Sequence, residues 1–150
     1  MFLALLSGCG EKQPIVDKQT FIMEMESHMY DIQNVETEVL ALFSEVMLMM
    51  LFPTDWEEYE ERARLLEAEY VRLLQEAEKI SLPEDKAGQK LHSNYVALIN
   101  EKNDLLGSLF EAIANFDIQK FVSLMTRLEA SFNKRWENFQ EIWYTYKTTG

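Results

Sequence analysis

The sequence predicts an all-α protein that folds as an elongated antiparallel up-down four-helix bundle. Apolar residues recur at steps of three and four from residue 17 almost to the C-terminus, which is helical spacing. Short breaks near residues 53, 82 and 116 divide this pattern into four long segments. No stretch alternates apolar and polar residues for long enough to predict a strand. Because the connections are short, each helix should run antiparallel to the one before it.

The first helix should begin after Asp17 and stop at Pro53, since proline cannot continue a helix and restricts the residue before it. Its apolar stripe consists of Ile22, Met25, Met29, Ile32, Val35, Val39, Phe43 and Val46.

The second helix should begin at residues 54–57, where Thr-Asp-Trp-Glu is typical of a capping box. From Trp56 to Ile80 its apolar residues alternate steps of three and four without a slip. The resulting repeat of 3.5 residues favours the left-handed packing of helical bundles.

The third helix is predicted to start at residues 81–84, where Ser-Leu-Pro-Glu repeats the capping pattern with proline in the first turn. Lys102 stands where its stripe expects an apolar residue. Asp117 follows a polar break and should cap the fourth helix, which runs to about Tyr146. The alternative is a three-helix, coiled-coil-like bundle in which the break at 115–117 is only a kink.

The chain is strongly acidic, with 26 Asp and Glu against 14 Lys and Arg, and a formal charge of −12. Phosphates of nucleic acids and anionic lipid headgroups should repel such a chain. We therefore expect no nucleic-acid partner and no membrane attachment through a polybasic patch. The single cysteine, Cys9, cannot form an internal disulfide.

The stretch before Cys9 combines an apolar run at residues 2–6 with the small pair Ser7-Gly8. Leu6-Ser7-Gly8-Cys9 resembles the lipobox of bacterial lipoproteins. The resemblance implies that residues 1–8 are a signal peptide and that Cys9 becomes a lipidated N-terminus, carrying a diacylglycerol thioether. No Lys or Arg precedes the apolar run, so we expect the natural start to lie upstream of Met1 or the segment to be truncated.

This interpretation divides the chain into a signal peptide (1–8), a lipidated cysteine with its tether (9–16) and a helical bundle (17–147). Two or more acyl chains suffice for stable anchoring, so the bundle should sit on the outer face of a bacterial cell membrane. The alternative is a cytosolic protein with a buried apolar N-terminal segment and a chance cysteine.

Residues 80–140 resemble a hairpin found in secreted or lipid-anchored helical domains of Gram-positive bacteria. The resemblance rests on Leu82-Pro83, His92 and Asp117. Those families are mostly of unknown function, so it implies a location and a fold but no activity.

The sequence contains no pattern that predicts catalysis. It lacks a glycine-rich phosphate loop, His-Glu-x-x-His and Gly-x-Ser-x-Gly. Neither histidine has the preceding glutamate of di-iron bundles. We therefore expect a protein that is not an enzyme and that has no cofactor.

Three residues of the first helix form a candidate metal site. Met25, His28 and Met29 lie within about one turn of each other, and thioether and imidazole ligands suit Cu(I). The alternative is core packing, because Met25 and Met29 belong to the apolar stripe and methionine fills gaps well.

A candidate partner surface lies at the end of the first helix, where residues 46–52 are all apolar. A helix that is apolar on every side cannot bury all of its residues against one bundle face. The antiparallel topology brings the residues around 56 and 116 to the same membrane-distal tip. Either these side chains form a closed cap, or they bind a protein partner or a second copy. The candidate residues are Leu48, Met49, Phe52, Trp56 and Phe116.

Trp143 and Tyr144, near the end of the fourth helix, should lie level with the start of the first helix. Both residue types suit a membrane–water interface. The alternative places Trp143 in the core and leaves Tyr144 exposed. Taken together, the sequence favours a non-catalytic interaction or scaffold lipoprotein of the cell envelope. The alternative is a lipoprotein that binds a small ligand or Cu(I).

Overall fold

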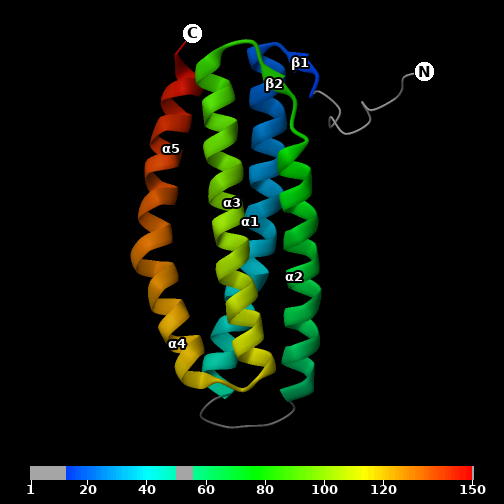
Figure 1. Ribbon diagram of the computed structural model, residues 1–150, viewed down its shortest axis with the longest axis vertical. Coiled ribbons are helices and arrows are strands. Elements are labelled where there is room, and N and C mark those ends of the chain that lie inside the picture. The colour runs from blue at the N-terminus through cyan, green and yellow to red at the C-terminus, as the bar shows by residue number, and fades with distance from the viewer. Residues whose placement is uncertain (1–12, 50–55, 150) are drawn as a thin grey trace, which may run out of the picture.

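The computed structural model describes residues 13–49 and 56–149 and is an antiparallel four-helix bundle (Figure 1). The predicted all-α fold is therefore confirmed. The three-helix alternative is wrong, because the chain reverses direction at residues 115–117. The helices are α1 (Lys18–Met49), α2 (Trp56–Glu78), α3 (Lys86–Ala114), and a fourth rod made of α4 (Ile118–Arg127), the π-helical turn η1 (Leu128–Phe132) and α5 (Asn133–Thr148).

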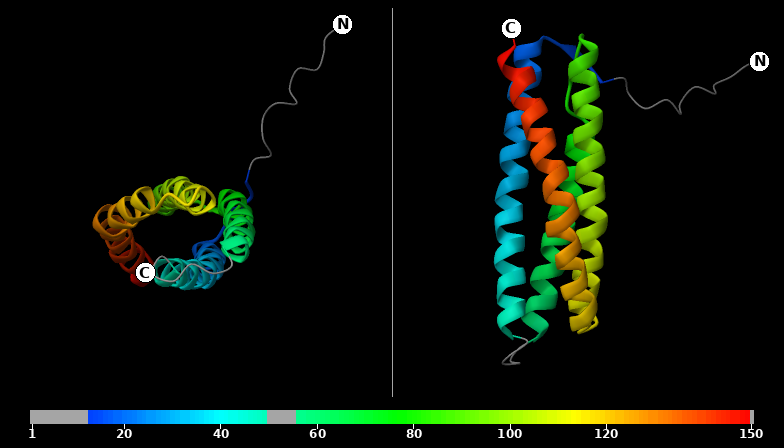
Figure 2. Two further views of the ribbon diagram at one scale, coloured as in Figure 1. Left: turned by 90° about the horizontal axis from the view of Figure 1, so that it is seen from below. Right: turned by 90° about the vertical axis from the view of Figure 1, so that its left-hand side faces the viewer.

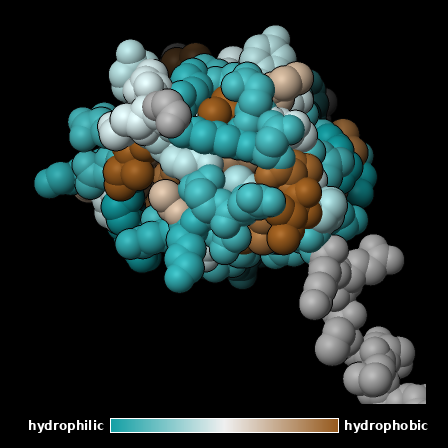
Figure 3. All heavy atoms as spheres, turned by 90° about the horizontal axis from the view of Figure 1, so that it is seen from above, coloured by the Kyte–Doolittle hydropathy of each residue, from teal (hydrophilic) through white to brown (hydrophobic). Residues whose placement is uncertain are grey.

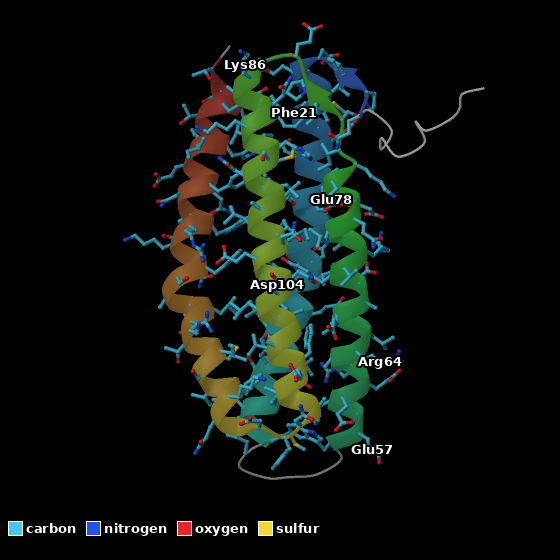
Figure 4. All side chains as sticks on the ribbon, viewed as in Figure 1. Phe21, Glu57, Arg64, Glu78, Lys86 and Asp104 are labelled. Atoms are coloured by element: carbon cyan, nitrogen blue, oxygen red, sulfur yellow. The ribbon has the colours of Figure 1, made fainter. Side chains whose placement is uncertain are left out.

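The four rods form a ring in chain order, and the rod of α4 and α5 closes it beside α1 (Figure 2). We call the end that holds Ile15, Lys86 and Thr149 the base. The opposite end, which holds Met49, Trp56 and Phe116, is the tip (Figures 1 and 4). With 32 residues, α1 is about 48 Å long, and this sets the distance between base and tip.

Large aromatic side chains fill the interior of the ring. Phe21, Phe43 and Tyr95 are fully buried. The ring of Phe21 meets the rings of Trp143 and Tyr146 edge-on, at 6.2 and 6.0 Å between centroids. Edge-to-face pairs add stabilisation beyond the area they bury, so this cluster fastens α1 to α5 near the base.

Two short strands that the sequence did not predict stabilise the base. β1 (Ile15–Val16) pairs in parallel with β2 (Leu82–Pro83), and the Leu82 N–H donates to the Pro14 carbonyl at 3.1 Å. Two residues are too few to show a period of two in the sequence. The pair attaches the segment before α1 to the connection between α2 and α3.

This pairing also corrects the predicted start of the third helix. The N-cap of α3 is Asp85, whose side chain accepts the Gly88 N–H at 2.7 Å. Ser81 instead donates its backbone N–H to the Glu24 carboxylate at 2.8 Å. Because Leu82 and Pro83 are extended in β2, a helix cannot begin at Ser81.

The fourth rod begins as predicted, since the Asp117 carboxylate accepts the Lys120 N–H at 3.0 Å. Its π-helical turn was not predicted. Core residues of this rod are spaced by four from Leu124 through Leu128 to Phe132, which exceeds the 3.6 residues of an α-helical turn. A wider turn keeps Phe132 directed into the core.

Candidate functional site

The tip is built around an unusual helix end. Asn115 is the C-cap of α3. The Asp117 N–H donates to the Ala112 carbonyl at 2.8 Å, and the Phe116 N–H donates to the Ile113 carbonyl at 3.1 Å. These two bonds define a Schellman motif, in which the residue after the C-cap adopts a left-handed conformation and is usually glycine.

Phe116 occupies that glycine position with a φ of 54°. A bulky residue is a genuine outlier there, and the conformation costs about 1–2 kcal/mol relative to glycine. The Phe116 side chain is nevertheless 50% exposed. Its ring meets the Trp56 ring edge-on, with centroids 4.7 Å apart.

Trp56 connects the start of α2 to the end of α3. Its indole N–H donates to the Ile113 carbonyl at 2.9 Å, and its ring lies 6.0 Å from that of Tyr59. The side chain is half-buried and packs on the core. Trp56 is therefore held between α2 and α3, and the exposed Phe116 ring packs against it.

The end of α1 carries further exposed apolar side chains at the same end of the bundle. Val46 is fully buried, but Met47 is 44% and Leu48 is 66% exposed. We call Met47, Leu48, Trp56 and Phe116 the tip patch. Of the other candidate residues, Met49 is half-buried, and Phe52 lies outside the described residues. The tip thus combines the buried Val46 with several apolar side chains that are exposed or half-buried.

The candidate metal residues lie in a hydrogen-bonded part of the core. His28 is buried, with Nε2 2.7 Å from the Leu73 carbonyl and Nδ1 2.6 Å from the Tyr95 hydroxyl. A carbonyl only accepts, so Nε2 carries the proton and Nδ1 accepts from Tyr95. Burial lowers the pKa of His28 and keeps the ring neutral.

This geometry favours core packing over copper binding. The only lone pair of the His28 ring is occupied by Tyr95, Met25 is fully buried and Met29 is partly buried. Within residues 13–49 and 56–149, no group of three or more His, Cys, Asp or Glu residues could hold a metal ion. The Cu(I) site stays a prediction that the described contacts do not favour.

The core also contains an ion pair that the sequence analysis missed. Lys102 of α3 pairs with Glu36 of α1 across the bundle, and their side chains are only 12% and 21% exposed. The Lys102 ammonium also lies 4.8 Å from the centre of the Phe132 ring. The interruption of the stripe at Lys102 was visible in the sequence, but only the fold identifies Glu36 as its partner.

Tyr70 is the second unexpected polar group of the core. It is fully buried, and its hydroxyl has no hydrogen-bond partner in the part of the chain that the structure describes. Burial, reinforced by the negative charge of Glu36, raises the pKa of Tyr70 well above its ordinary value. Tyr70 is therefore a neutral packing residue of the core.

At the base, the two predicted membrane-interface residues, Trp143 and Tyr144, differ in their burial. Trp143 is buried, with its ring stacked on that of Tyr146, whereas Tyr144 is 65% exposed. Adjacent helical residues point about 100° apart, so only one of the two can face the core. Trp143 is thus a core residue, and Tyr144 alone remains available to an interface.

The predicted lipidation site, Cys9, lies outside the described residues and stays a prediction. The described chain begins at Gln13, whose side-chain amide donates to the Glu78 carbonyl. No helix in the described ranges combines the length and the apolar character needed to cross a bilayer. Because Gln13 lies beside the end of α2, a membrane attachment through Cys9 would reach the bundle at its base.

No protein-family model, no curated protein and no solved structure matches this chain. The molecule is defined by its own features, a helical bundle with an apolar tip at one end and its N-terminal segment at the other.

Proposed function

We propose that the protein is a non-catalytic, lipid-anchored interaction protein of the bacterial cell envelope. Its tether holds the base at the membrane, and its tip patch binds an envelope protein or a second copy of the chain. The anchor rests on the resemblance of Leu6-Ser7-Gly8-Cys9 to a lipobox.

The observation that carries the proposal is the conformation of Phe116. Glycine would be free of strain in this Schellman position, whereas phenylalanine is strained and leaves half of its side chain in water. A strained, exposed aromatic residue is typical of a functional surface rather than of a stabilising turn. Its neighbours in the tip patch provide the adaptable apolar surface that protein partners recognise.

The position of the tip supports the same proposal. It lies at the opposite end of the bundle from Gln13, the first described residue. An anchored bundle would therefore present the tip patch at a distance from the bilayer, where a partner can reach it.

The anchor is tested by Cys9→Ala. We expect the variant to leave the membrane fraction, because the acyl chains that hold the protein there need the Cys9 thiol. The measurement is membrane fractionation of the native cell with metabolic acyl labelling. Ser7→Ala is the matched control, because it keeps the lipobox pattern and should keep the label. Unchanged fractionation of Cys9→Ala, with no label on the wild type, would contradict the anchor.

The tip is tested by the double variant Leu48→Ser, Phe116→Gly. Glycine removes the strain at position 116 while losing one edge-to-face pair, worth about 0.5–1.5 kcal/mol. Leu48 is 66% exposed, so its replacement should change the stability by no more than about 0.5 kcal/mol. We therefore expect a melting temperature within a few degrees of the wild type and a tenfold or greater loss of association.

Association is measured by cross-linking and pull-down from native membranes, and by sedimentation of the purified chain. The matched control is Leu40→Ser, Leu65→Ser, because both leucines are 55% exposed and lie away from the tip. This control should associate as the wild type does. A large loss of stability with unchanged association would mean that the tip patch only closes the core.

A further inference from the structure

The ends of all four rods meet at the tip. One shallow depression there is bordered by Phe116 and lined by Val46 of α1, Trp56 of α2, Ile113 of α3 and Phe121 of α4. The depression is too small to enclose a ligand, so a partner would lie across the end of the bundle, against the exposed Phe116 ring. At the opposite end, the base, apolar groups form separate patches among hydrophilic side chains (Figure 3).

Every cation that the structure describes at the tip is paired with a carboxylate. Residues 42–49, 56–64 and 111–122 carry three cations and seven carboxylates, a net charge of −4. The three ion pairs are Arg62 with Glu45, Arg64 with Glu61, and Lys120 with Glu111. Within these ranges, the tip therefore has no free cation to offer to an acidic partner.

Four carboxylates of the tip have no such ion pair. Glu57, Glu58 and Glu60 belong to the start of α2, and no Lys or Arg of the described chain lies within ion-pair distance of them. Glu57 and Glu58 are exposed, and Figure 4 shows Glu57 at the outer end of α2. Asp117 directly follows Phe116 and is also exposed. Uncompensated negative charge thus lies beside the exposed apolar side chains.

This combination of charges and apolar groups selects among the possible partners. A symmetric dimer uses the same patch on both copies, so the carboxylates of one tip would face those of the other, and opposed like charges are costly. Anionic lipids and nucleic acids would be repelled in the same way. A partner with lysine or arginine would find carboxylates, and the exposed Phe116 ring would offer an aromatic face for a cation.

We infer that the tip patch receives a cationic amphipathic helix of a partner protein. The apolar side chains of this helix lie against Trp56 and Phe116, and its lysines or arginines lie against the carboxylates at the start of α2. The Met47 thioether lets the surface adapt to such a helix, as methionine does in other surfaces that bind amphipathic helices. This inference rests on the proposed function and names the chemistry of its partner.

The probe is a fluorescently labelled synthetic helix of leucine and lysine, about 18 residues or five turns long, with the leucines on one face. Fluorescence anisotropy measures its binding to the full chain. We expect binding that weakens with added salt. The variant Glu57→Gln, Glu58→Gln should weaken the affinity by about three- to tenfold at low salt, because it removes two charges of the tip. A peptide with glutamate in place of lysine should not bind.

The matched control is Glu137→Gln, Glu141→Gln, which makes the same charge change on exposed carboxylates of α5 and should bind as the wild type does. Glu57 and Glu58 also favour the first turn of α2 through the helix dipole, so thermal unfolding is measured to verify that both variants are folded at the temperature of the assay.

Three results would overturn the inference while leaving the tip patch as a binding surface. The first is a loss of binding in Leu48→Ser, Phe116→Gly with no loss in Glu57→Gln, Glu58→Gln. The second is binding of the glutamate peptide as tight as that of the lysine peptide. The third is a dimer of the purified chain, seen by sedimentation, that Leu48→Ser, Phe116→Gly dissociates. Equal weakening by both charge variants would mean unspecific attraction to an acidic protein, and it would also overturn the inference. Binding that no variant of the tip weakens would contradict the proposed function as well.

Discussion

Replacing Phe21 with alanine should lower the free energy of unfolding by about 3–5 kcal/mol, the usual loss for a buried phenylalanine. Phe21 is fully buried, and its ring contacts Trp143 and Tyr146, which face it from α5. Without the ring, a cavity opens where the first and last rods of the bundle meet. The loss should appear in urea unfolding as a lower midpoint with an unchanged slope.

Two further substitutions on α1 separate this effect from a general loss of side-chain area. Tyr30→Ala removes a ring that is 65% exposed, and it should change the stability by no more than about 0.5 kcal/mol. Phe21→Leu keeps most of the volume and should cost less than Phe21→Ala. If Phe21→Ala cost no more than Tyr30→Ala, the aromatic cluster would not be what closes the ring.

The rods could be predicted from the sequence because each has a continuous apolar stripe and a local signal at its ends. Asp117 is such a signal, because its capping bond lies within three residues of it. Ser81 has the same local pattern but does not cap a helix, since the next two residues pair with β1. Local capping chemistry competed with a tertiary contact, and the tertiary contact prevailed.

The tip could be located from topology alone, but its key feature could not. Antiparallel helices with short connections bring the ends of α1 and α3 together, and this placed residue 116 beside residue 56. The left-handed φ of Phe116 opposes the preference of its residue type, so no propensity predicts it. The hydrogen bonds of His28 were equally hidden, because Tyr95 and Leu73 lie far from it in the sequence.

The ion pair in the core leads to the second large effect on stability. Lys102→Met should lower the free energy of unfolding by about 3 kcal/mol, because it leaves the Glu36 carboxylate mostly buried and without its cation. This value is at the low end for buried pairs, since both side chains retain some contact with water. Glu36→Met should cause a similar loss by stranding the ammonium of Lys102.

The double variant Glu36→Met, Lys102→Met should recover to within about 1 kcal/mol of the wild type or exceed it. Well-packed apolar side chains often replace a buried ion pair without loss, because no charge then has to leave water. Urea unfolding of all four proteins completes a double-mutant cycle, in which the two losses should be strongly non-additive. The exposed pair of Arg64 with Glu61 is the control, and Arg64→Met should have little effect. If the double variant lost as much as both single variants together, the pair would be stabilising the core through its packing rather than its charges. Recovery would instead show that the pair of Lys102 and Glu36 adds no net stability over apolar side chains at the same two positions.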